Sequence, residues 1–121
     1  MPKYDYEHIH LISPDPEKTA EFYIKMFGAK KESITKMGGG TMVRLQLNGS
    51  LIIISSARVQ PPVYGLDHFG LTTDNLDKSA AELKAAGCQF RMEPTEIVPG
   101  TRIAFFWTPE KVLIELVEKK G

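Results

Sequence analysis

Three side chains of this sequence are of types that bind divalent metal ions, and two of them open similar stretches. His8 begins His-Ile-His-Leu-Ile-Ser-Pro-Asp, and His68 begins His-Phe-Gly-Leu-Thr-Thr-Asp-Asn 60 residues later, from position 8 to position 68. Glu115 lies in the apolar run Val-Leu-Ile-Glu-Leu-Val, where burial of a carboxylate is costly unless it is paired. Two imidazoles and one carboxylate are a common ligand set for a divalent metal ion, with positions left for substrate or water.

Each of these residues also has a simple structural explanation. A single histidine on a strand more often forms a structural hydrogen bond than a metal bond, and a lone glutamate in a strand usually faces water. The apparent duplication favours a shared site, because two equivalent strands around a pseudo-twofold axis bring equivalent histidines together. A purely structural or partner-binding domain would instead keep His8 and His68 far apart.

His10 is a further candidate for chemistry. Side chains alternate along a strand, so His10 is expected on the face of His8, about 6–7 Å further along. We hypothesise that it is the catalytic general base or acid beside a metal-bound substrate. It could also be an alternative ligand, a residue that supports a ligand, or a hydrogen-bonded structural residue.

The elements that must position these residues are predicted by local patterns. Asp15 and Pro16 are typical of a helix start, and Gly28 of a helix end. Each half of the chain is therefore expected to fold as β-α-β-β-β, within one domain of residues 1–121 made of repeats at about 4–58 and 66–118. The expected strands are 6–12, 31–36, 42–47, 51–55, 66–72, 89–92, 102–107 and 112–117, and the expected helices are 16–27 and 76–86.

Composition excludes several classes of protein. The formal net charge of zero gives no basic footprint for nucleic acid, and the longest apolar run, Leu51–Ile54, is too short to span a membrane. The single cysteine and the polar N-terminus indicate a reducing, cytoplasmic location. The glycines at 38–40 lack the context of a phosphate loop and predict a hairpin turn.

In order along the chain, these pieces resemble the vicinal oxygen chelate superfamily of glyoxalases, methylmalonyl-CoA epimerases, extradiol dioxygenases and bleomycin resistance proteins. The resemblance covers nearly the whole chain and implies an α+β fold of two βαβββ modules that form an open, cup-shaped mixed β-sheet around a metal ion. The matching pieces are His8 to Asp15, Phe22-Tyr23, Phe27-Gly28, His68 to Gly87, Pro109 and Leu113 to Leu116.

The resemblance implies that His8, His68 and Glu115 hold the first, third and fourth metal positions of the family. Ile53 falls at the second position, where a glyoxalase or an epimerase normally has Glu, Gln or His. Because isoleucine cannot bind a metal, the remaining His-His-Glu set is more similar to that of extradiol dioxygenases. The turn Thr108-Pro109-Glu110-Lys111 also departs from the family's Asp-Pro-Asp-Gly.

The predicted function is therefore that of an enzyme that chelates a small oxygen-bearing substrate on iron, manganese, nickel or zinc, with lyase, isomerase or dioxygenase chemistry. The alternative is a metal-free small-molecule binding protein similar to bleomycin resistance proteins. Arg102 is a candidate for binding an anionic substrate group, although a surface ion pair is its simpler explanation. Trp107 is a candidate substrate contact among neighbouring core aromatics. The resemblance also implies a homodimer.

Overall fold

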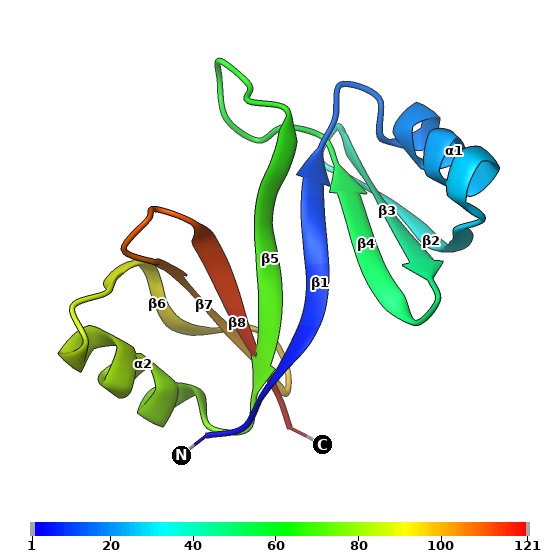
Figure 1. Cartoon of the computed structure of the whole chain (residues 1–121). Coiled ribbons are helices and arrows are strands. Elements are labelled where there is room, and N and C mark those ends of the chain that lie inside the picture. Colours follow the sequence, from blue (N-terminus) through cyan, green and yellow to red (C-terminus); the bar gives the residue numbers. More distant parts are fainter. Residues whose placement is uncertain (1, 121) are drawn as a thin grey trace. The chain divides into compact units, whose positions relative to one another are not determined.

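The computed structural model describes residues 2–120, apart from the side chain of Met37, and has an α+β fold (Figure 1). Each half of the chain has the predicted order strand, helix, strand, strand, strand. The elements are β1 (Tyr4–Ile12), α1 (Pro16–Phe27), β2 (Lys30–Met37), β3 (Gly40–Leu47), β4 (Ser50–Ser55), β5 (Gly65–Thr73), α2 (Leu76–Ala85), β6 (Gln89–Val98), β7 (Thr101–Trp107) and β8 (Leu113–Lys119).

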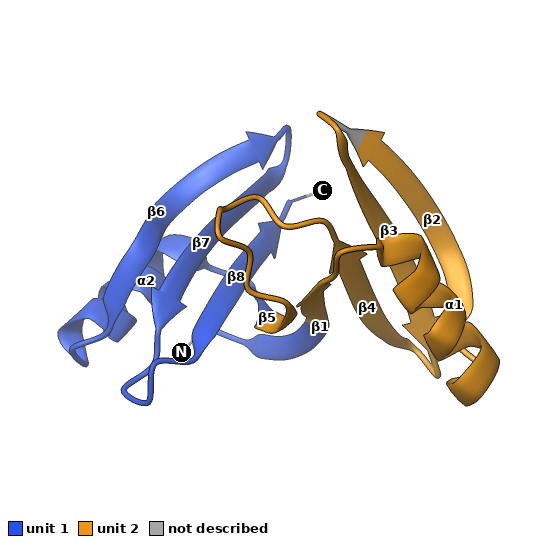
Figure 2. Cartoon of the chain, turned by 90° about the horizontal axis from the view of Figure 1, so that it is seen from above, with its two compact units in different colours: residues 1–7, 68–121 blue, residues 8–67 orange. Residues whose placement is uncertain are grey.

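The chain divides into two compact units, which Figure 2 shows in two colours. Unit 2 is His8–Asp67, and unit 1 combines Met1–Glu7 with His68–Gly121. The N-terminal part of β1 thus belongs to unit 1. There the backbone N–H of Lys3 donates to the Asp74 carboxylate at 3.0 Å, and the Lys3 carbonyl accepts from the Asp74 N–H at 3.3 Å.

In unit 2 the strand order is β2-β3-β4-β1, with β4 parallel to β1 and the other neighbours antiparallel. One face packs against α1 and carries the buried core of the unit. The opposite face carries His8, His10 and Ile53, because residues alternate along each strand. The buried core residues are Ala20, Ala29, Val43, Leu45, Ile52 and Ile54.

In unit 1 the order is β5-β8-β7-β6, with β8 parallel to β5 and the other pairs antiparallel. The face that packs against α2 forms a second core, and Glu115 lies on the opposite face. Its buried core residues are Leu76, Ala104, Phe106, Ile114 and Leu116. Neither helix of the described residues has the length and apolarity needed to cross a membrane.

The two helix starts repeat the same hydrogen bonds, which is direct structural evidence for the duplication. In unit 2 the Lys18 N–H donates to the Asp15 carboxylate at 3.2 Å, and the Ser13 and Thr19 hydroxyls lie 2.6 Å apart. The equivalent contacts in unit 1 are made by residues exactly one repeat later. They are Lys78 N–H to the Asn75 side chain at 3.0 Å and Thr73 to Ser79 at 2.7 Å.

One difference between the helix starts has a clear chemical reason. The first residue of α1 is Pro16, which has no backbone N–H to satisfy. The equivalent residue of α2 is Leu76, whose N–H donates to Glu118 at 2.8 Å. Glu118 is 3% exposed and lies in β8. The strand expected at 112–117 therefore ends too early, since β8 continues to Lys119 and the Glu118 carboxylate completes the helix start.

The strand predicted at 89–92 is also longer than expected, since β6 continues to Val98. Pro94 lies within it and would be excluded from a central strand, because proline has no N–H for the ladder. β6 pairs only with β7 among the described strands, and its register shifts on both sides of Met92 and again before Val98. An edge strand with bulges accommodates the proline.

Candidate metal and substrate site

In unit 1, His68 and Glu115 lie side by side on the face opposite α2. His68 Nε2 is 3.2 Å from Glu115 Oε1, and the side chains are only 5% and 13% exposed. His68 comes from β5, and Glu115 comes from the neighbouring parallel strand β8. The register partner of Glu115 in β5 is Gly70. Gly70 is buried and has no side chain that could contribute a ligand next to this carboxylate.

The ring of Phe105 orients His68. The two ring centroids are 5.0 Å apart at an interplanar angle of 85°, an edge-to-face arrangement. Phe105 is also the register partner of Glu115 across β7 and β8. The guanidinium of Arg91 lies over this ring, 5.1 Å from its centroid. Phe105 was not singled out among the neighbouring aromatics, but strand alternation places it on the face of Glu115.

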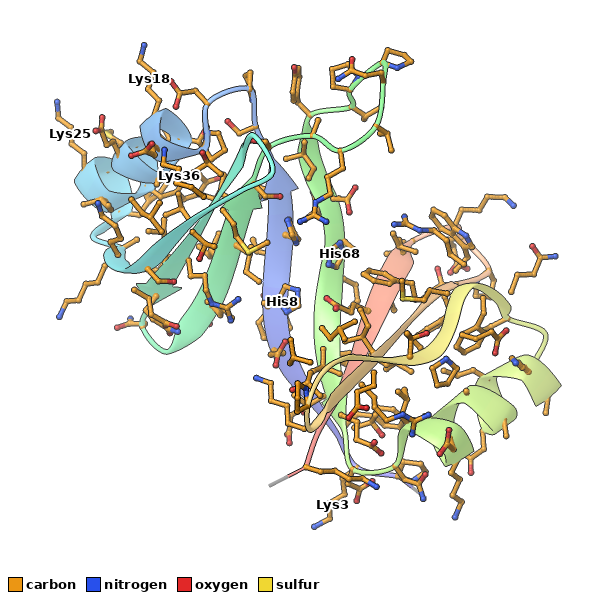
Figure 3. All side chains as sticks on the ribbon, turned by 180° about the vertical axis from the view of Figure 1, so that it is seen from behind. Lys3, His8, Lys18, Lys25, Lys36 and His68 are labelled. Carbon is orange, nitrogen blue, oxygen red and sulfur yellow. The ribbon has the colours of Figure 1, made fainter. Side chains whose placement is uncertain are left out.

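In unit 2, His8 and His10 share one face of β1, as strand alternation predicts. Their ring centroids are 6.3 Å apart, and His8 is 3% exposed. His10 Nε2 forms a hydrogen bond of 2.6 Å with the hydroxyl of Ser55 at the end of β4. Figure 3 labels His8 on β1 and, in the other unit, His68 on β5.

The strand registers establish which positions of the two repeats are equivalent. His10 pairs with Ile53 across the parallel strands β1 and β4, and Gly70 pairs with Glu115 across β5 and β8. Since Gly70 is the repeat counterpart of His10, Ile53 is the structural counterpart of Glu115. At these two equivalent positions, unit 1 therefore has Gly70 and Glu115, whereas unit 2 has His10 and Ile53.

A cavity of about 510 Å³ lies in unit 2, at the end of β4. It is lined by the tip of the β2–β3 hairpin, by Ser55 and by the segment that follows it. Ser56 joins the two walls, because its hydroxyl accepts from the Thr41 N–H at 3.1 Å and its own N–H donates to the Thr41 carbonyl at 3.0 Å. The lining residues are Gly38, Gly39, Gly40, Thr41, Met42, Ser55, Ser56, Ala57 and Arg58.

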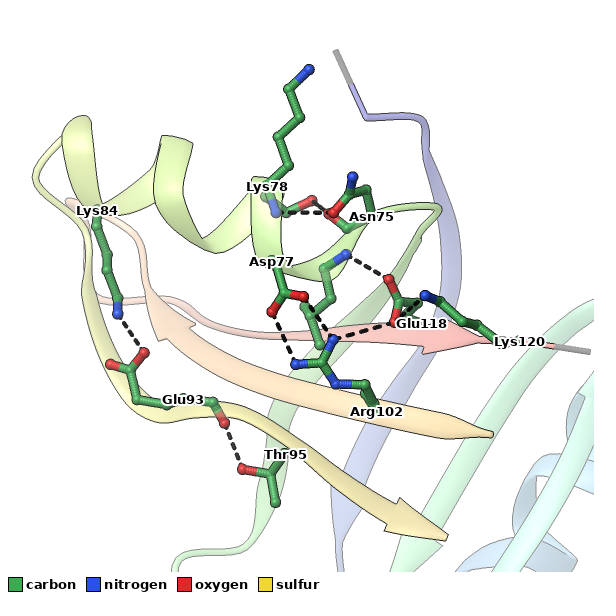
Figure 4. A network of polar contacts seen from close by, with 11 residues as sticks. Asn75, Asp77, Lys78, Lys84, Glu93, Thr95, Arg102, Glu118 and Lys120 are labelled. Carbon is green, nitrogen blue, oxygen red and sulfur yellow. Dashed lines mark hydrogen bonds and ion pairs between the residues drawn. The ribbon is translucent and has the colours of Figure 1, made fainter. Parts of the chain in front are cut away.

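Arg102 is placed in a polar network of unit 1 (Figure 4). Its guanidinium donates two hydrogen bonds to Asp77, at 3.0 and 2.9 Å, and lies 3.6 Å from Glu118. The bidentate contact with Arg102 lowers the pKa of Asp77 and raises the pKa of Arg102. Lys120 also approaches Glu118, at 4.0 Å. The surface ion pair considered from the sequence is thus present, and substrate binding by Arg102 stays a prediction.

Trp107 is the last residue of β7 and is 36% exposed. It pairs with Leu113 of β8 and therefore shares the face of Phe105 and Glu115. Phe106, between them, packs into the core on the α2 face. One of the neighbouring aromatics thus fills the core, and the substrate contact by Trp107 stays a prediction.

Comparison with known proteins places the chain in one family. The family model of the glyoxalase, bleomycin resistance protein and dioxygenase superfamily matches residues 6–116. The chain belongs to this superfamily. It is also 31% identical over 121 residues to the uncharacterized protein YwkD of Bacillus subtilis (strain 168), covering 93% of this chain and 94% of that protein.

Solved structures show the same fold at lower sequence identity. The hypothetical protein BH1468 from Bacillus halodurans C-125 matches with a TM-score of 0.81 and 20% identity, over 98% of this chain and 96% of that chain. Methylmalonyl-CoA epimerase from Mycobacterium tuberculosis matches with a TM-score of 0.76 and 20% identity, over 96% and 88%. The predicted α+β, glyoxalase-like fold of two βαβββ modules is confirmed.

Proposed function

We propose that this chain is a metal-dependent isomerase or lyase, in which His8, His68 and Glu115 bind one divalent ion. The observation that carries the proposal is the buried His68–Glu115 pair, in which an imidazole nitrogen and a carboxylate oxygen lie 3.2 Å apart. Donor atoms of this kind suit iron, manganese, nickel or zinc. An alternative ligand set consists of three imidazoles, those of His8, His10 and His68.

The chemistry of the donor set fits a metal ion. Burial of a carboxylate is costly unless a positive charge lies beside it, and a divalent ion would supply that charge. When bound, a divalent ion supplies a positive charge that polarises a substrate oxygen and stabilises an enolate-like anion. The edge-to-face contact with Phe105 restrains the orientation of the His68 ring.

His10 is the residue that we assign to proton transfer. It lies on the face of His8, and the hydroxyl of Ser55 fixes the position of its Nε2. A general base needs this kind of orientation beside the carbon from which it takes a proton. Ile53, its register partner, is buried and has no donor atom, so it contributes only apolar surface beside His10.

Metal binding is the first test. Protein freed of metal by chelation and dialysis would be titrated calorimetrically with manganese, nickel and zinc, and anaerobically with iron(II). We expect one ion per chain, and a Kd raised by more than about 100-fold in Glu115→Gln and in His68→Gln, since loss of a supporting residue alone costs about 10–100-fold. Glu93→Gln removes an exposed carboxylate of the same unit and is the matched control.

Unchanged metal affinity in both variants would contradict the proposed ligand set. Absence of any binding by the original protein would instead favour the metal-free small-molecule binding protein.

The reaction class would be tested by NMR, as exchange of deuterium from D₂O into carbon atoms next to a carbonyl, with a panel of small oxo acids and thioesters. Oxygen consumption with catechols, without such exchange, would favour the dioxygenase.

A further inference from the structure

We propose that the cavity at the end of β4 is a binding site for an anionic group, a carboxylate or a phosphate. Its volume of about 510 Å³ lies within the range of about 300–1,000 Å³ that is typical of small-molecule sites. All nine lining residues belong to unit 2. The site is therefore defined by the packing of one unit alone.

The charge of the lining points to an anion. Arg58 is the charged residue of the cavity wall, and it is exposed. Lys36 pairs with Glu17 and Arg44 with Glu32 in the same unit, whereas no acidic side chain of the described residues pairs with Arg58. A guanidinium that has no carboxylate beside it can bind a carboxylate or a phosphate through two parallel hydrogen bonds.

The opposite wall gives a ligand close access to the backbone. Gly38 and Gly39 form the two-residue turn of the hairpin and have φ angles of +51° and +83°. Both angles are positive, as the tight hairpin turn requires, and a Cβ at either position would meet no atom within 4 Å. The turn therefore presents backbone rather than side chains to the cavity, which resembles the walls of many anion sites.

Ser55 connects the cavity with the residue proposed for proton transfer. Ser55 is one of the lining residues, and its hydroxyl is 2.6 Å from His10 Nε2. An anion bound at Arg58 would hold the substrate at one end and direct its other end toward His10. This last step rests on the proposed function, whereas anion binding in the cavity does not.

The test uses the full chain after removal of metal, with malonate and inorganic phosphate as separate probes at constant ionic strength. We expect amide chemical shift changes in NMR spectra at residues 38–41 and 55–58, and a Kd raised at least about tenfold in Arg58→Gln, as for loss of a charge-assisted hydrogen bond. Lys25→Gln is the matched control, since Lys25 extends from α1 away from the strands (Figure 3).

Tighter binding of malonate or of phosphate assigns the group as a carboxylate or a phosphate. The proposal would be overturned by amide chemical shift changes that are spread over the surface lysines. Equal affinities of Arg58→Gln and Lys25→Gln for the probes would also overturn it. Because the metal-free protein is used, a failure of the metal site leaves this measurement intact. Repetition with metal-loaded protein and His10→Gln separates the two proposals, since this variant should keep its affinity for both probes.

Discussion

The carboxylate of Glu118 accepts a hydrogen bond of 2.8 Å from the backbone N–H of Leu76, 42 residues earlier in the chain. This contact joins the end of β8 to the first residue of α2, and both residues are buried. A helix start has N–H groups that the helix itself cannot satisfy. In unit 1 one of them is satisfied by a residue of the last strand.

Replacement of Glu118 with alanine should destabilise the protein strongly. The change leaves the Leu76 N–H buried without an acceptor, and removal of a hydrogen bond to a charged group costs about 1.5–3 kcal/mol. The free energy of unfolding, measured with urea, should fall by about 2 kcal/mol. Glu93→Ala is the control, because its ion pair with Lys84 is exposed and should contribute less than about 1 kcal/mol. Equal effects of the two variants would contradict this role of Glu118.

The ion pair of Asp77 and Arg102 should make stability depend on acidity. The pKa of Asp77 is lowered in the folded protein, mainly by its hydrogen bonds to Arg102. The stabilisation is therefore fully present above the unfolded pKa of about 3.9 and is lost as the pH falls through the lower folded value. The free energies of unfolding of the original protein and of Asp77→Asn would be compared by urea unfolding from about pH 6 to about pH 2.5. Their difference should be constant at the higher pH values and should disappear in acid. A difference that grows on acidification would refute this assignment.

A glutamate at position 53 should strengthen metal binding. Ile53 is the structural counterpart of Glu115, so Ile53→Glu adds a carboxylate at the equivalent place in the other repeat. We expect a metal Kd lowered at least about tenfold, and a metal-free protein of lower stability, because position 53 is buried. Calorimetric titration and thermal unfolding with and without metal measure both effects. Ile53→Gln, which is polar but uncharged, shows whether the charge is needed; weaker binding in both variants would argue against the equivalence.

The two helix caps should contribute equally, since their hydrogen bonds are equivalent. Loss of a cap typically costs about 1 kcal/mol, and we expect this in Asp15→Ala and in Asn75→Ala. Asp15→Ser retains a capping oxygen and should lose only a few tenths of a kcal/mol. Urea unfolding measures the three variants. A large loss in one unit only would mean that the two helix starts do not contribute alike, despite their shared geometry.

Local signals in the sequence predicted the elements well, for physical reasons that can be named. Asp15, Asn75 and Gly28 act on the backbone within one helical turn, so their effect can be inferred without knowledge of the fold. The glycines at 38–40 similarly predicted the hairpin turn. Alternation along β1 and β8 correctly placed His8 with His10, and Glu115 with Leu113.

Features that depend on distant parts of the chain could not be predicted. The contact of His10 with Ser55 joins residues 45 apart, and only the register of β1 and β4 brings them together. Glu118 lies beyond the strand predicted at 112–117, and its role could not be inferred because its partner, Leu76, is 42 residues away in the sequence. The strand predicted at 89–92 stops before Pro94, and β6 tolerates this proline because it has one neighbour among the described strands.

The bulged course of β6 has a consequence for how copies of this chain can associate. Pro94 offers no N–H on this strand, and the register shifts interrupt the regular spacing of its outer backbone groups. A strand from a second molecule would find an irregular template here, so extension of the β-ladder into a polymer is disfavoured. Pairing of two copies along β6 would have to rely on contacts between side chains, which protects this margin of the protein against aggregation.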